Sequence, residues 1–124
     1  MLVGFFLAGL ITLGGLQQWW LQPILENMHP TLVFYGSLVL TAFTDNAALT
    51  YLGSLVDGTS QEFKVALVSG AVIGGGLTVI ANAPNPAGVA ILRSYFPNLT
   101  ISAVGLFLGA LGPTLVAITI FKIL

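Results

Sequence analysis

Four polar residues stand inside stretches of sequence that are otherwise apolar enough for a membrane interior. Asp45 and Asn46 lie near the middle of one long apolar run, and Asn82 and Asn85 lie near the middle of a second. A carboxylate at the centre of a bilayer costs about 2.5–3.5 kcal/mol of insertion free energy, so by default it indicates a functional site. Carboxylate and amide oxygens are the ligands that a hard cation prefers. The residue types therefore predict a site for a small cation such as Na⁺.

Asp45 is the one acid that lies well inside an apolar block. A proton and a metal cation compete for the same carboxylate oxygens, so a single acid can release a proton when it binds a cation. The alternative is a protonated aspartic acid that only hydrogen-bonds to a neighbouring helix. Hydroxyl groups near the polar residues could add further oxygen ligands, although threonines in membrane helices more often bond their own backbone. These hydroxyls belong to Thr44, Thr50 and Thr78.

The composition places the chain in a lipid bilayer. Of its 124 residues, 56% are hydrophobic and 6% are charged, whereas a soluble domain carries roughly 25% charged residues. The net charge of −1 provides no basic surface for nucleic acid. The chain has no cysteine, so it can form neither a disulfide nor a thiolate metal site. No nucleotide-binding, nucleophile or zinc-helix motif occurs, so we expect no enzymatic activity and no cofactor.

Four apolar blocks predict an all-α membrane protein with a single transmembrane domain over residues 1–124. The first and last blocks contain 23 residues each, which corresponds to about 34 Å of helix and suits a hydrocarbon core of about 30 Å. The expected elements are a transmembrane helix over 3–25, a re-entrant helical hairpin over 31–56, a broken transmembrane helix over 62–96 and a transmembrane helix over 101–123.

The block over 31–56 allows two structures. Its two arms on either side of Asp45 are too short to span a bilayer separately. Either the whole run is one crossing helix with Asp45 buried in it, or both arms enter and leave by the same membrane face and Asp45 lies at the tip. The periodicity of the sequence does not choose between them. Non-helical backbone at this depth requires protein or a wet cavity around it.

The polar break at 82–86 most plainly lies inside the membrane. If it were a loop in water, the mostly apolar segment 87–96 would be left as a ten-residue piece of about 15 Å that cannot cross alone. Pro84 and Pro86 remove two backbone donors and clash with the preceding turn, so a continuous helix is not expected. The block then consists of two half-helices that meet at an unwound linker bearing Asn82 and Asn85.

Two of these segments resemble motifs of a known group. Residues 41–50, TAFTDNAALT, resemble the hairpin-tip signature of the ion transporter superfamily, and residues 74–88, GGGLTVIANAPNPAG, resemble its glycine-rich approach and Pro/Asn break. With the stretch GGLQQWW at 14–20, the chain is most similar to the putative sodium/proton antiporter family of that superfamily. The likeness covers essentially the whole chain, in the right order.

The resemblance implies an elevator-type fold with two inverted repeats, each with a re-entrant hairpin and a broken helix. Ions would bind between the tip, matched by Asp45 and Asn46, and the break, matched by Asn82 and Asn85. The chain corresponds to one half, the C-terminal-like one. We therefore expect a fragment or a half-sized subunit that needs a second repeat half or a partner chain, with homo-oligomerisation left open.

These observations together predict sodium/proton antiport by a multi-pass protein of the cell (inner) membrane, with Na⁺ and H⁺ as the transported ions. An acid at the tip favours cation exchange, because carboxylate carriers of the superfamily have a Ser-Asn-Thr type of tip. Two alternatives stay open. One is an anion transporter of the same superfamily for arsenite or a carboxylate, and the other is a membrane subunit that only assembles with others.

Overall fold

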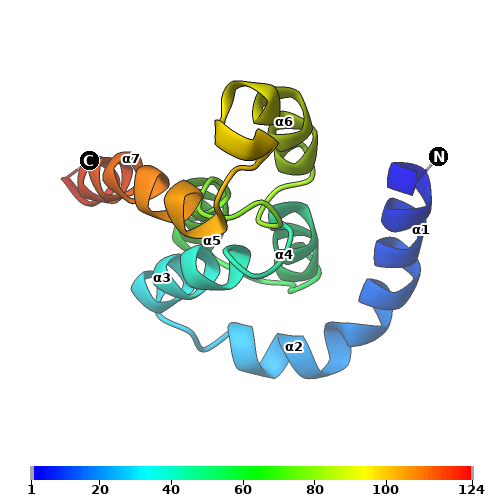
Figure 1. The fold of residues 1–124 in the computed structure, drawn as a ribbon. Coiled ribbons are helices and arrows are strands. Elements are labelled where there is room, and N and C mark those ends of the chain that lie inside the picture. The colour runs from blue at the N-terminus through cyan, green and yellow to red at the C-terminus, as the bar shows by residue number, and fades with distance from the viewer. Residues whose placement is uncertain (1, 124) are drawn as a thin grey trace.

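The computed structural model describes residues 2–123 of the chain. Within that range it is built of helices and contains no strand (Figure 1). The all-helical class expected from the apolar blocks is confirmed. The elements in chain order are α1 (Leu2–Gly14), η1 (Gly15–Gln17), α2 (Gln18–Leu25), α3 (Pro30–Thr41), α4 (Asn46–Ser54), α5 (Gln61–Gly74), α6 (Asn85–Leu92), η2 (Arg93–Tyr95), η3 (Pro97–Leu99) and α7 (Ala103–Ile123).

The first apolar block is bent, unlike the single helix expected over 3–25. A 3₁₀ turn separates α1 from α2, and the two helices lie at a large angle to each other (Figure 1). The bend falls at the pair Gly14 and Gly15, and adjacent small residues are a common cause of helix kinks. The ring of Tyr51 on α4 packs there, since its Cε1 lies 2.8 Å from the position that a Cβ of Gly14 would take.

Three of the central helices begin at a polar side chain that caps the first turn. His29 precedes α3, and its Nδ1 accepts a hydrogen bond from the backbone N–H of Thr31 at 3.3 Å. Asp45 precedes α4, and Ser60 precedes α5 and accepts from the N–H of Phe63 at 3.1 Å. Such caps satisfy backbone donors that have no partner within the helix. They fix where each apolar segment starts.

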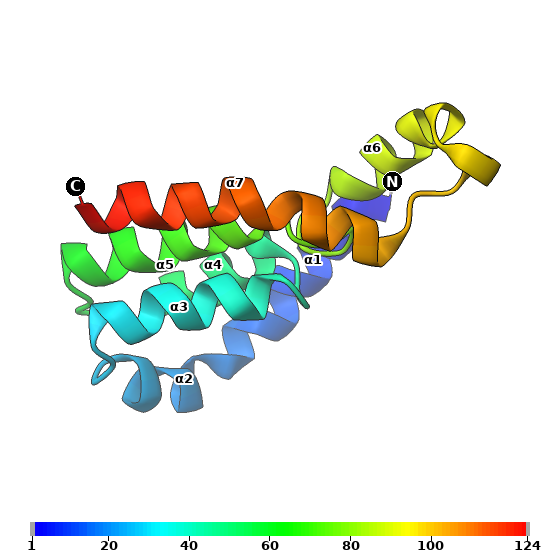
Figure 2. The same cartoon turned by 60° about the vertical axis from the view of Figure 1, so that its left-hand side comes forward.

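The core lies between α3 and α5, which are parallel neighbours along most of their length (Figure 2). Their close approach depends on Gly70 and Gly74. A Cβ at Gly70 would overlap the carbonyl oxygen of Phe34, and a Cβ at Gly74 would overlap that of Leu38. Small residues at this spacing let two helix backbones come together. The buried apolar side chains here are Val33, Phe34, Leu38, Ala42, Phe63, Ala66, Leu67 and Leu77.

The helices divide the molecule into two ends. α4 runs antiparallel to α3, so the start of α3, the end of α4, the start of α5 and the end of α7 lie together, and we call this end the base (Figure 2). α6 and η2, which carries Arg93, lie at the other end. The charged residues and the histidine of the base are Glu26, His29, Asp57, Glu62, Lys64 and Lys122.

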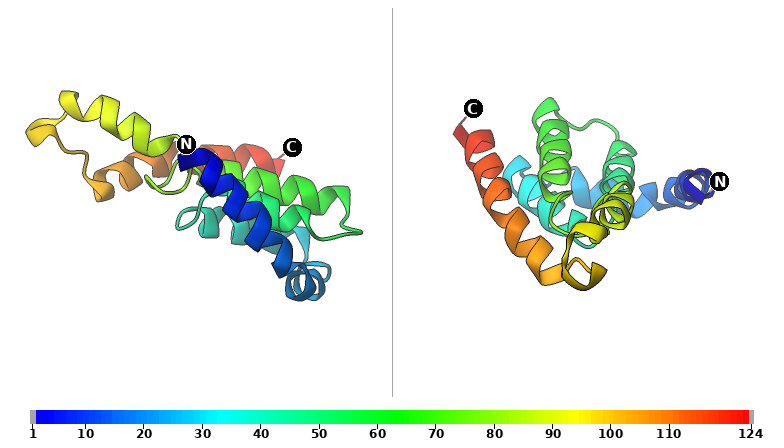
Figure 3. Two further views of the ribbon diagram at one scale, coloured as in Figure 1. Left: turned by 90° about the vertical axis from the view of Figure 1, so that its right-hand side faces the viewer. Right: turned by 45° about the horizontal axis from the view of Figure 1, so that its top comes forward.

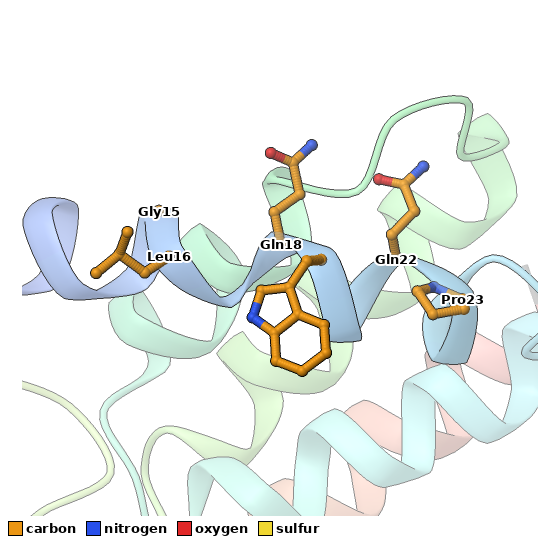
Figure 4. Close-up of a pocket in the computed structure, with 6 residues that line it drawn as sticks. Gly15, Leu16, Gln18, Gln22 and Pro23 are labelled. Carbon is orange, nitrogen blue, oxygen red and sulfur yellow. The ribbon is translucent and has the colours of Figure 1, made fainter.

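Two glutamines of α2 hold the base loop that joins α4 to α5. Gln18 Nε2 donates to Asp57 Oδ2 at 3.3 Å, and Gln22 Oε1 accepts from the backbone N–H of Asp57 at 3.3 Å. Both side chains point to the same side of α2, beside a shallow surface hollow (Figure 4). Gln18, within the motif at 14–20, and Gln22, just after it, therefore connect the first apolar block to the loop between α4 and α5.

α7 covers α3 and α5 on the side away from α1 (Figure 3). The ring of Phe121 stacks on that of Phe34 with centroids 4.6 Å apart, and Lys122 Nζ lies 5.1 Å from the ring centroid of Tyr35. Thr114 is its one buried residue among those described. By length and composition, α7 is the one helix within residues 2–123 that could cross a membrane by itself.

Candidate functional site

The turn between α3 and α4 meets the interruption between α5 and α6. We call residues 41–46 the tip and residues 75–84 the break. The backbone N–H of Asn46 donates to the carbonyl oxygen of Ala81 at 3.1 Å. The hydroxyl of Thr78 donates to the carbonyl oxygen of Ala42 at 2.7 Å. Two segments that are about 35 residues apart in sequence are therefore hydrogen-bonded to each other.

The break is non-helical because its sequence offers little to continue α5. Gly75 and Gly76 follow the last residue of α5, and glycine is a poor helix former. Ten residues pass before α6 starts at Asn85. Pro84 is the N-cap of α6, and Pro86 stands in its first turn, where its missing N–H would have had no helical partner. The prolines that interrupt the long block thus also start its second helix.

Asp45 stands at the tip as the N-cap of α4. Its Oδ1 accepts hydrogen bonds from the backbone N–H groups of Ala47 at 2.9 Å and Ala48 at 3.2 Å. This is a favourable place for a carboxylate because a helix N-terminus carries a partial positive charge. The side chain is half-buried, and within residues 2–123 no donor bonds its second oxygen, Oδ2. One oxygen is therefore anchored while the other stays available.

The three predicted asparagines lie on both sides of the junction between tip and break. Asn85 Nδ2 donates to the carbonyl oxygens of Gly75 at 2.8 Å and Thr78 at 2.9 Å, so its side chain connects the two sides of the break. Its Oδ1 can only accept, and no donor within residues 2–123 bonds it. Asn46 Nδ2 lies 3.3 Å from the position that a Cβ of Gly75 would take. Asn82 is half-buried within the break, and its backbone carbonyl oxygen accepts from the backbone N–H of Asn85.

Two of the three predicted threonines bond nearby backbone: Thr44, in the tip, bonds the end of α3, and Thr50 bonds its own helix α4. The hydroxyl of Thr44 donates to the backbone carbonyl oxygen of Leu40 at 2.9 Å. The hydroxyl of Thr50 donates to the backbone carbonyl oxygen of Asn46, also at 2.9 Å. Thr78 differs, because its hydroxyl reaches across the junction. Thr44 and Thr50 thus follow the ordinary behaviour of threonine in apolar helices.

Thr41 takes part in the junction, although the sequence reasoning did not single it out. It is fully buried, and its hydroxyl lies 3.4 Å from the carbonyl oxygen of Ala81 and 3.5 Å from that of Thr44. The signal in the sequence is weak, since it is only a hydroxyl four residues before Asp45. Its role depends on a partner 40 positions away.

A cavity of about 280 Å³ adjoins the break between α6 and α7. It reaches the polar side chain of Asn85, and most of its other walls are apolar. Within residues 2–123 no three histidine, cysteine or acidic side chains come together to form a metal cluster. The cavity is lined by Gly76, Pro84, Asn85, Gly88, Val89, Leu92, Phe96, Ile101 and Leu106.

The comparisons with known proteins identify the family. No curated protein and no solved structure matches the chain. A family model described as "Putative Na+/H+ antiporter" matches residues 1–124, which is the whole chain. The chain therefore belongs to this family of membrane ion transporters.

Proposed function

We propose that the chain, within the complete transporter, exchanges Na⁺ for H⁺ at the junction between tip and break. One observation carries the proposal. Asp45 has one carboxylate oxygen anchored on α4 and a second without a donor among residues 2–123. The other acids lie at the base, where Glu26 and Asp57 line one hollow and Glu62 is in the first turn of α5. Asp45 is thus the acid placed to bind a cation beside the break.

The exchange follows from competition at Asp45 Oδ2. When Na⁺ arrives, it takes the place of a proton, and when a proton returns, Na⁺ leaves, so the carboxylate is neutralised in both states. Carboxylate and carbonyl oxygens suit a hard cation. The side-chain oxygens of Asn46, Asn82 and Asn85 are the further ligands that we propose. The break adds the carbonyl groups of an unwound helix, a device that recurs in secondary transporters.

The hydrogen bonds at the tip favour a cation over the arsenite or carboxylate alternative. An anion carrier would need free N–H groups at a half-helix N-terminus. At α4 the N–H of Asn46 is used by Ala81, and those of Ala47 and Ala48 are used by Asp45 itself. The carboxylate of Asp45 already occupies the position that an anionic substrate would take.

We propose a re-entrant hairpin and a broken crossing helix in a multi-pass protein of the cell (inner) membrane, and the arrangement of the helices supports the first two. Along the long axis of the molecule, the tip between α3 and α4 lies between the base and the end that carries α6 (Figure 2). α5 and α6 together extend from the base to the far end, whereas α3 and α4 return to the base. Many of the exposed side chains are large and apolar, and we propose that a second repeat half, on a longer chain or a partner, completes the transport path.

Labelling from one side of the membrane tests the hairpin. We expect cysteines introduced as N27C and T59C to react with an impermeant reagent added from the same side, because both positions lie at the base. S94C, at the far end, should react from the opposite side. The chain has no cysteine of its own. Reaction of N27C and T59C from opposite sides would replace the hairpin with a plain crossing helix.

Transport by the complete protein tests the function. In proteoliposomes that contain a pH dye, external Na⁺ should enter and drive protons out, so the internal pH should rise. Choline at the same concentration is the control and should leave the pH unchanged. Because Na⁺ and H⁺ compete for one site, acidification should raise the apparent KM for Na⁺. Sodium-dependent uptake of arsenite or a carboxylate without proton movement would overturn the proposal in favour of anion transport.

A further inference from the structure

Two threonine hydroxyls cross the junction in opposite directions. Thr41, at the end of α3, donates to the carbonyl oxygen of Ala81 in the break. Thr78, in the break, donates to the carbonyl oxygen of Ala42 in the tip. The partners are 40 and 36 positions apart. Each segment therefore supplies one hydroxyl to a backbone carbonyl of the other.

The side chain of Thr41 is fully buried and packs against α5. Its Cγ2 packs directly on Gly74, so closely that a Cβ at that glycine would overlap it. The methyl group thus faces α5, and the hydroxyl lies between the carbonyl oxygens of Ala81 at 3.4 Å and Thr44 at 3.5 Å. The same carbonyl oxygen of Ala81 also accepts the N–H of Asn46, the residue after Asp45. Thr41 therefore bonds the same backbone carbonyl, that of Ala81, that also holds the N–H of Asn46.

We infer that Thr41 and Thr78 are positioning residues, which join tip and break so that the proposed cation site keeps one geometry. The inference rests on the proposed function, and it assigns Thr78 a role different from that of a Na⁺ ligand. Neither hydroxyl needs to touch the ion. Their effect passes through Ala81 and Ala42 to the backbone beside Asp45. Removing either hydroxyl should leave the ligands in place but let the two segments separate more often.

Valine is the matched replacement because it has nearly the shape of threonine and lacks the hydroxyl. In the complete transporter, T41V and T78V should each raise the apparent KM for Na⁺ by about threefold to tenfold, which is the effect of losing one net hydrogen bond. The maximal rate should change less than KM. T41S and T78S keep the hydroxyl, so the KM of each should stay within about twofold of the wild-type value.

T119V is the control, because the hydroxyl of Thr119 bonds the carbonyl oxygen of Leu115 within α7. It should leave KM unchanged. If T41V and T78V only lower the amount of folded protein and leave KM at the wild-type value, the hydroxyls are structural and the inference is overturned. Wild-type exchange in the same assay separates that failure from a failure of the proposed function.

Hydrogen–deuterium exchange gives a readout that does not depend on transport. Opening of the junction exposes the N–H of Asn46, so peptides over 42–49 should exchange about threefold to tenfold faster in T41V and T78V than in the wild type. Peptides of α7 should be unaffected. Equal exchange rates over 42–49 in all variants would overturn the inference whether or not the protein moves Na⁺.

Discussion

Replacing Asp45 with asparagine should abolish sodium-driven proton movement by the complete transporter. Asparagine caps a helix about as well as aspartate, so D45N should keep the hydrogen bonds to the N–H groups of Ala47 and Ala48. It removes the negative charge and the exchangeable proton. The expected loss of exchange would therefore report on the chemistry of the carboxyl group and not on the fold of the tip. The measurement is the sodium-driven change in internal pH in proteoliposomes.

Two further variants separate charge from structure. D45A removes both charge and cap and should cost about 1 kcal/mol of stability in addition to losing exchange. D57N is the matched control, because Asp57 lies at the base and bonds Gln18 and Gln22 through its side chain and backbone. It should retain exchange. If D45N moves protons in response to Na⁺ as the wild type does, Asp45 is not the coupling residue, and the site must be sought elsewhere.

The sequence predicted that the second long apolar block is interrupted, because the signals for an interruption are local. The interruption begins earlier than predicted, at Gly75, and Asn85 and Pro86 lie in α6 and not on an unwound linker. Proline has no backbone donor, and the residues beyond Pro86 are too few to span a bilayer separately. These facts placed an interruption at 82–86, and the structure has a non-helical stretch that ends at Pro84. The sequence also predicts a polar interruption at Asp45, and the structure shows that this residue is the N-cap of α4. The choice between a hairpin and one crossing helix over 31–56 had no such signal.

The features that the sequence could not give depend on contacts between distant residues. The bend at Gly14 involves Tyr51, and the burial of Thr41 involves Ala81 and Gly74. A glycine or a threonine in an apolar helix can have several structural roles, and the residue that it contacts in the folded protein determines which role it has. For the same reason Thr78 was grouped with Thr44 and Thr50, although it alone of the three crosses the junction. These roles depend on the pairing of α3 with α5, which no local pattern in the sequence specifies.

Adding one methyl group at Gly74 should have the largest effect on stability. In G74A the new Cβ would overlap the backbone carbonyl oxygen of Leu38 and the Cγ2 of Thr41. A carbonyl oxygen within α3 cannot move without shifting the helix, so α3 and α5 would have to separate. Overpacking of this kind costs about 1–3 kcal/mol. The measurement is the midpoint of thermal unfolding of the purified complete transporter. It is monitored as the loss of the monodisperse peak in size-exclusion chromatography after heating.

G109A is the matched control for that experiment. Gly109 lies in α7, and a Cβ there would meet no atom within 4 Å. In water-exposed helices alanine is favoured over glycine by about 1 kcal/mol, so G109A should unfold at or above the wild-type midpoint while G74A unfolds well below it. Equal midpoints for the two variants would mean that α3 and α5 are not in close contact. The tip, which α3 carries, and the break, which α5 carries, would then have no common support, and the site built from Asp45 and the asparagines could not exist in this form.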